Sequence, residues 1–180
     1  MASTIISLAL RGCQALFAII ILGLSAGLLK GQVVKDQLPS TIPYAIFTGA
    51  FGLVCACIGV ASNWVEILQT VLMAGIDCAV AFFYLAGGVI IAYKLRGINC
   101  AKSDFATRKK MTGNNLLNGG CEKAEGRTLC GYTENDDYTY RAGTLNARCK
   151  QSEADAAFMF MSVLLMAACV AMLFIQLKKK

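Results

Sequence analysis

Long apolar segments separated by polar links dominate the pattern of this chain. Four segments are apolar almost throughout, at about residues 5–29, 44–62, 67–93 and 156–177. A helix needs roughly 20 such residues to cross the roughly 30 Å of hydrocarbon in a bilayer. The pattern therefore predicts an all-α integral membrane protein in which residues 1–180 form a single domain, an antiparallel bundle of four transmembrane helices.

The composition agrees with this prediction. Hydrophobic residues make up 57% of the 180 residues, more than a soluble domain of this size would hide in its interior. A cleaved signal peptide is the alternative interpretation of the first segment. It is disfavoured because no basic stretch precedes the apolar run and because the run is longer than a typical signal core.

The longest polar stretch, about residues 97–152, holds Cys100, Cys121, Cys130 and Cys149. It has too few apolar residues to fold around a core of its own, so we expect disulfide bonds to order it. Of the three pairings, we prefer Cys100–Cys149 with Cys121–Cys130, because the first pair lies at neighbouring ends of antiparallel helices. Zinc is disfavoured, since close Cys-x-x-Cys pairs and His are both absent from the sequence.

Two signals conflict over the side of the membrane. Thirteen of the 17 Lys and Arg residues lie in the links opposite the termini, which a simple charge count would place in the cytoplasm. The cysteines favour an oxidising compartment for the long loop, and long loops cross membranes with weak regard to charge. We therefore expect an extracellular loop and cytoplasmic N- and C-termini.

Arg11 and Asp77 are the charged residues that lie within apolar segments. At similar depth in the membrane, each unpaired charge would cost at least about 2.5–3.5 kcal/mol. An ion pair, with Gln14 as a further donor, would lower this cost and fix the packing of the first and third helices. Alternatively, Arg11 extends to the headgroups and Asp77 is protonated or bonded to backbone. The sequence leaves both interpretations open.

Small and basic residues suggest contacts with other helices and with lipid. Small residues at intervals of three or four allow helices to approach closely, inside one bundle or between copies. Lys178, Lys179 and Lys180 follow the last apolar segment and are expected to bind the anionic cytoplasmic leaflet, at about 1 kcal/mol each. The helix-packing candidates are Gly23, Gly27 and Gly31 in the first segment and Gly49 and Gly52 in the second.

No catalytic constellation stands out in the sequence. Without His, a Ser or Cys nucleophile lacks its usual base, and no Gly-rich phosphate loop follows a strand. We expect a non-enzymatic protein without metal or cofactor. Nucleic acid is not an expected partner, because the short basic run at residues 108–110 lies beside a membrane.

Several features resemble the MARVEL-domain membrane proteins of fungi, nearest the non-classical export branch associated with eisosomes. They are Arg11 in the first helix, Asp77 in the third, Cys100 closing that helix, and a Cys-x-Gln lead into the fourth at Cys149 and Gln151. The resemblance covers all four apolar segments. The matching stretches are LRGCQALFAIIILGLSAGLL, GIDCAVAFFYLAGGVIIAYKLRGINC and RCKQSEADAAFMF.

The resemblance implies a multi-pass protein of the plasma membrane with cytoplasmic termini, whose family cysteines correspond to Cys100 and Cys149. It also implies a membrane organiser, a homo-oligomer that associates with sphingolipid- or sterol-rich membrane to form or stabilise eisosome-type microdomains. The longer outer loop, with Cys121 and Cys130, departs from the family pattern.

Two other functions remain as alternatives. A tetraspanin-like adaptor would bind other membrane proteins through the cysteine-bonded loop, although the Cys-Cys-Gly signature is reduced here to Cys130-Gly131. A small channel or transporter is disfavoured, because the apolar segments contain almost no further charged groups.

Overall fold

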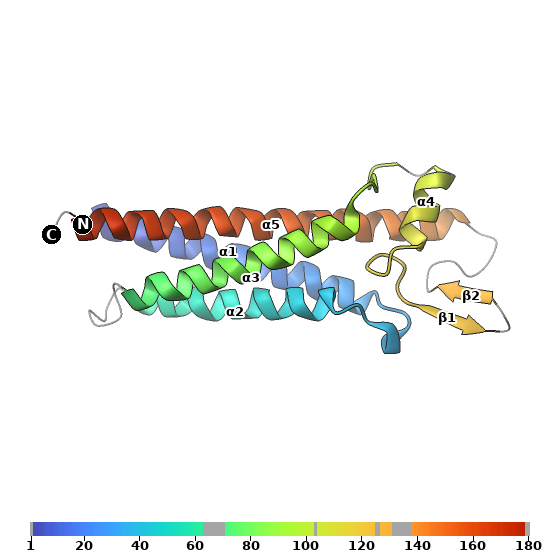
Figure 1. The fold of residues 1–180 in the computed structure, drawn as a ribbon, viewed down its shortest axis with the longest axis horizontal. Helices are drawn as coiled ribbons and strands as arrows, with labels where there is room; N and C mark the ends of the chain where they lie inside the picture. The colour runs from blue at the N-terminus through green and yellow to red at the C-terminus, as the bar shows by residue number, and fades with distance from the viewer. Residues whose placement is uncertain (1, 63–70, 103, 125–126, 131–137, 179–180) are drawn as a thin grey trace.

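A computed structural model shows an elongated bundle of four helices with a folded cap at one end (Figure 1). The structure describes residues 2–62, 71–102, 104–124, 127–130 and 138–178. The bundle helices are α1 (Ala2–Lys30), α2 (Thr41–Ala61), α3 (Val71–Leu95) and α5 (Tyr138–Lys178).

Each bundle helix contains a stretch that is long and apolar enough to cross a membrane. These stretches confirm the expected helical bundle with four candidate spans; they are Ile5–Lys30, Thr41–Ala61, Leu72–Leu95 and Gly143–Met172. The expected start of the third span, residues 67–70, lies outside the described residues. Pro43 falls in the first turn of α2, where its missing amide hydrogen leaves no intrahelical bond unmade.

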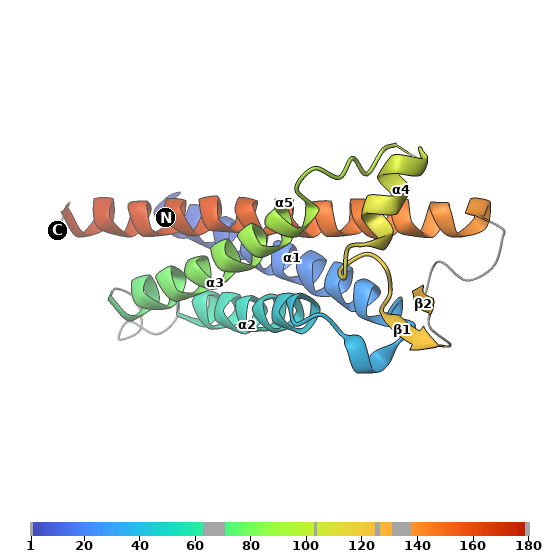
Figure 2. The ribbon, with the colours of Figure 1, turned by 45° about the vertical axis from the view of Figure 1, so that its right-hand side comes forward.

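The order of the helices around the bundle is α1, α2, α3, α5. Both α1 and α3 pack against α2 and α5, so α1 and α3 lie diagonally opposite each other. Figures 1 and 2 show the start of α1 and the end of α5 together at one end, which we call the terminal end. The other end, the loop end, carries the cap.

The cap is more ordered than the single outer loop that the sequence suggested. It contains α4 (Phe105–Thr112) and an antiparallel hairpin of β1 (Cys121–Ala124) and β2 (Arg127–Cys130). A short 3-10 helix, η1 (Lys35–Gln37), lies in the separate link between α1 and α2. The last part of the expected loop is helical, since α5 begins at Tyr138 rather than near residue 156. Buried positions at helical spacing within this extension, among them Leu145, Cys149 and Ser152, explain the difference.

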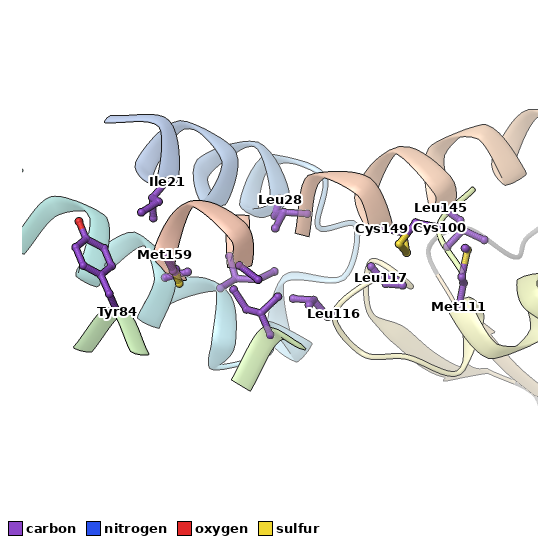
Figure 3. Close-up of a cluster of buried hydrophobic side chains, with 14 of the residues drawn as sticks. Ile21, Leu28, Tyr84, Cys100, Met111, Leu116, Leu117, Leu145, Cys149 and Met159 are labelled. Atoms are coloured by element: carbon purple, nitrogen blue, oxygen red, sulfur yellow. A yellow bond between two sulfur atoms is a disulfide. The ribbon is translucent and has the colours of Figure 1, made fainter. Parts of the chain in front are cut away.

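The cap does not depend on a separate core. Met111, Leu116 and Leu117 are at most 1% exposed and belong to the same hydrophobic cluster as Leu28 and Met159 of the bundle. Figure 3 shows this cluster passing from the bundle into the cap. The apolar residues of the cap were thus too few for a core of their own but sufficient to extend the core of the bundle.

A tight backbone contact joins the cap to the link between α1 and α2. The amides of Val33 and Val34 donate to the carbonyl of Gly119 at 2.9 and 3.1 Å. Gly120 follows with φ +90°, and a Cβ there would lie 2.9 Å from the carbonyl oxygen of Val34. Glycine at this position therefore allows both the left-handed backbone and the close approach.

Two disulfides complete the cap, and they are those of the preferred pairing. Cys100 is joined to Cys149, with their Cα atoms 5.3 Å apart, and links the segment after α3 to α5. Cys121 is joined to Cys130 across the hairpin, where the two residues face each other in register.

The glycines expected at helix contacts divide into two groups. Gly49 and Gly52 are buried; a Cβ on Gly49 would lie 3.0 Å from the backbone nitrogen of Leu22 in α1, and Gly52 adjoins the ring of Tyr84. Gly27 adjoins the Gln151 side chain, whereas Gly31 follows the end of α1 and donates its amide to the Gly27 carbonyl at 3.1 Å.

Gly23 does not pack inside the bundle. It is exposed, and a Cβ there would meet no atom within 4 Å. Gly23 lies on the outward face of α1, because the buried face of this helix runs through Ala18, Ile21, Ser25 and Leu28. Spacing of four along α1 therefore did not identify one common contact face.

Replacing Gly49 by leucine should destabilise the bundle by about 1–3 kcal/mol, because the side chain would overpack the α1 backbone. Gly23→Leu is the matched control and should leave the thermal midpoint of the detergent-solubilised monomer unchanged. The contact would be wrongly assigned if both variants lowered the midpoint equally.

Removing the Cys100–Cys149 bond should cost more stability than removing the Cys121–Cys130 bond, because it closes 49 residues of chain rather than 9. We expect Cys100→Ser/Cys149→Ser to lose about 1–2 kcal/mol more unfolding free energy than Cys121→Ser/Cys130→Ser. Chemical unfolding in micelles measures both losses, and an equal cost would contradict this ranking.

Candidate functional site

The main buried polar site joins α1 to α3 across the diagonal of the bundle. Arg11 Nη2 donates to Asp77 Oδ2 at 2.7 Å, and Nη1 donates to Asp77 Oδ1, so the guanidinium and the carboxylate form a bidentate pair. Arg11 is 8% exposed and Asp77 is 3% exposed. The structure thus brings together the two charges whose pairing the sequence left open, and we call this contact the diagonal ion pair.

The remaining helices are linked to the diagonal ion pair, α2 directly and α5 through Gln14. Gln14 Oε1 accepts from Arg11 Nη1 at 3.0 Å, and Gln14 Nε2 contacts Met166 Sδ at 3.0 Å and Cys169 Sγ at 3.2 Å in α5. In α2, a Cβ on Gly59 would lie 2.7 Å from Arg11 Cδ and Nε. Glycine at this position makes room for the guanidinium, so α2 packs directly against Arg11, while α5 is linked to it through Gln14.

A second row of polar contacts joins α5 to α1 nearer the loop end. Asp155 Oδ2 accepts from the Ser25 hydroxyl at 2.8 Å, and Gln151 Nε2 donates to the Leu24 carbonyl at 2.8 Å. Asp155 is 0% exposed, and its Oδ1 has no hydrogen-bond partner in the described part of the chain. We call Arg148, Gln151 and Asp155, with the α1 groups they contact, the α1–α5 polar seam.

Arg148 connects the α1–α5 polar seam to the cap. Its Nη1 donates to the Leu28 carbonyl at 3.0 Å and its Nη2 to the Leu116 carbonyl at 3.2 Å, and the residue is 4% exposed. The Leu28 carbonyl belongs to the last turn of α1, where carbonyls lack intrahelical partners and cations are favoured. Arg148 therefore caps α1 and holds the cap loop against it.

The sequence interpretation missed this seam. It placed Arg148 and Gln151 in the outer loop at about residues 97–152, left Asp155 just before the fourth apolar segment, and concluded that no further acid or base lay well inside a span. In the structure Asp155 lies within the candidate span Gly143–Met172. The buried positions Arg148, Ser152, Asp155, Met159, Ser162 and Met166 repeat every three or four residues, and this period was the signal that could have found the helix.

The remaining candidate residues are the three lysines at the end of the sequence. α5 ends at Lys178, while Lys179 and Lys180 lie outside the described residues. Three cysteines outside the disulfides, Cys13, Cys57 and Cys78, are exposed on the surface of the bundle.

The chemistry available to these sites is structural. The buried side chains form their hydrogen bonds mainly with groups of the helices themselves. The diagonal ion pair and the α1–α5 polar seam therefore hold the helices together. Within the ranges that the structure describes, no group of three or more Cys, Asp or Glu side chains is placed to hold a metal ion.

Neutralising one partner of the diagonal ion pair should destabilise the bundle by about 3–5 kcal/mol, because an unpaired buried charge remains. Arg11→Met and Asp77→Leu should each reduce folded, monodisperse protein, while the double variant should recover most of it. Lys102→Met, which removes an exposed cation, is the control. Thermal midpoints in detergent measure the losses. If the losses of the two single variants simply added in the double variant, Arg11 and Asp77 would not be energetically coupled.

The comparison with known families agrees with this architecture. The model of the MARVEL domain, described as a membrane-associating domain, matches residues 4–172, which include the candidate spans and the cap between the last two. Neither a curated protein nor a solved structure matches the chain. The chain is therefore a member of the MARVEL family of membrane-associating domains.

Proposed function

We propose that this MARVEL protein is a non-enzymatic organiser of the fungal plasma membrane, of the eisosome-associated type. In this proposal it self-associates and associates with sphingolipid- or sterol-rich membrane to form or stabilise microdomains. The cap faces the outside of the cell and both termini face the cytoplasm, where Lys178 to Lys180 contact the anionic leaflet.

The outward face of α1 is the observation that carries this proposal. Ile5, Leu16 and Ile19 are 69%, 54% and 53% exposed, and on the same face lie Gly12 and Gly23, where an added Cβ would meet no atom within 4 Å. Glycines let the backbones of two helices approach closely in lipid, where dispersion replaces the hydrophobic effect. This face therefore suits contact with a second copy or with rigid sterol-rich lipid.

The disulfides support the proposed orientation. Disulfide bonds persist in oxidising compartments and are rare in the cytosol. The two in the cap lie at the loop end, opposite the termini. An outward cap and cytoplasmic termini satisfy this constraint together.

The alternative is a tetraspanin-like adaptor that binds other membrane proteins through the cap. The observation that favours it is the order of the cap, whose buried residues extend the core of the bundle. A rigid, disulfide-bonded surface lowers the entropy lost when a partner binds.

Self-association through α1 can be tested in giant vesicles that separate into sterol-rich and sterol-poor phases. Gly12→Leu/Gly23→Leu should weaken self-association at least about tenfold and reduce enrichment in the sterol-rich phase, because the helices can no longer approach closely. Energy transfer between labelled copies and the distribution of fluorescence between phases measure the two effects.

The matched control is Gly75→Leu/Gly143→Leu, which adds two leucines at glycines of α3 and α5 that also have open space around them. The control should behave as the unsubstituted protein. A monomer that distributes evenly between the phases and binds membrane proteins only through an intact cap would favour the adaptor instead.

A further inference from the structure

A basic groove lies where α3 leaves the bundle and the end of α4 folds back beside it. Its volume is 510 Å³, within the range of roughly 300–1,000 Å³ that is usual for sites of small ligands. Figure 1 shows α4 next to the end of α3 at the loop end. The polar and aromatic residues that line it are Tyr93, Lys94, Arg96, Lys110, Asn114 and Asn115.

The charged residues that the structure places in the lining of this groove are all cations. Lys94, Arg96 and Lys110 line it together, and no acidic side chain that the structure describes belongs to the lining. None of the three forms an ion pair with a residue that the structure describes. Asp104, the acidic residue at the start of α4, accepts from the Thr107 hydroxyl at 2.8 Å and from its amide at 3.2 Å, and these bonds lower the pKa of Asp104.

Backbone contacts hold the walls of the groove in place. Asn114 Nδ2 donates to the Lys94 carbonyl at 2.6 Å, which ties the segment after α4 to the last turn of α3. Lys110 Nζ lies 3.4 Å from the Gly97 carbonyl, and Gly97 has φ +76°, which turns the chain out of α3. The cationic side chains therefore project from a fixed frame.

The groove also lies at the level where a lipid headgroup is expected. The candidate span of α3 ends at Leu95, so Lys94 and Arg96 bracket the end of the hydrophobic stretch. Tyr93 is 74% exposed there, as is usual for an aromatic residue at the membrane interface. One to two turns deeper, Val89 and Ile90 are 51% and 41% exposed and offer an apolar surface for acyl chains.

We propose that this groove binds the phosphate group of a membrane lipid whose acyl chains lie along the exposed face of α3. Three cations suit a phosphate, and the two asparagine side chains supply further polar contacts for the rest of the headgroup. The inference rests on the proposed association with lipid and names the lipid chemistry: an anionic headgroup that carries a phosphate.

The test uses the full chain in phosphatidylcholine vesicles that contain a minor fraction of phosphatidylinositol. Both leaflets carry the probe lipid, so the result does not depend on orientation. Native mass spectrometry after gentle release counts the phosphatidylinositol retained per chain. Lys94→Gln/Arg96→Gln/Lys110→Gln should retain at least about tenfold less, because each cation near an anionic surface adds to binding.

The matched control is Lys35→Gln/Lys102→Gln/Lys109→Gln, which removes the same charge from exposed positions outside the groove lining. It should retain phosphatidylinositol as the unsubstituted chain does. Equal loss in both triple variants would overturn the proposal, because diffuse charge would then explain binding. If the groove variant does not fold, judged by its thermal midpoint, Arg96→Gln alone gives the same comparison against Lys102→Gln.

Inorganic phosphate separates a lipid site from a site for a soluble anion. An excess that fails to displace phosphatidylinositol supports the proposal, whereas full displacement together with binding of phosphate alone overturns it. Self-association is measured on the same preparations. Retained lipid without self-association supports the groove and contradicts only the proposed organiser function, and the reverse result contradicts only the groove.

Discussion

The diagonal ion pair is the contact on which the arrangement of the bundle depends. α1 and α3 are not neighbours in the bundle, so the pair of Arg11 and Asp77 bridges helices that otherwise have little contact. Lipid supplies no hydrophobic force that would hold the helices together. The free energy of the two buried charges is lowered only when the helices hold them in the paired geometry. Gly59 leaves the space that this geometry needs. The pair therefore specifies the register of the helices as well as their association.

The two ends of the molecule are stabilised in different ways, and the long helix α5 connects them. At the terminal end, Met166 and Cys169 of α5 contact Gln14, which in turn accepts a hydrogen bond from Arg11 of the diagonal ion pair. At the loop end, Arg148 of α5 holds the cap loop against α1. The neighbouring Cys149 joins α5 to the segment after α3. Because the core is continuous through both regions, the cap is a rigid extension of the bundle.

The sequence predicted those features that the membrane itself requires. Four apolar segments had to be helices, and two charges within them had strong physical reason to meet. The start of α5 was missed because its charged outer face conceals a buried row that includes Arg148 and Asp155. The outward position of Gly23 was missed because a spacing of four residues identifies one face of a helix but not what packs against that face. The basic groove was missed because the approach of α4 to α3 brings together cations that are distant in the chain, Lys94 and Lys110.

The diagonal arrangement also separates the two proposed membrane contacts. The outward face of α1, with Gly12 and Gly23, and the outward face of α3, below Lys94 and Arg96, belong to opposite corners of the bundle. A second copy bound to α1 would therefore leave the groove beside α3 open to lipid. Since the cap is fixed to the bundle, each copy in such an assembly would hold its groove at the same depth in the same leaflet. Self-association would then align lipid phosphates around the assembly, which is one physical route from a small bundle to an ordered patch of membrane.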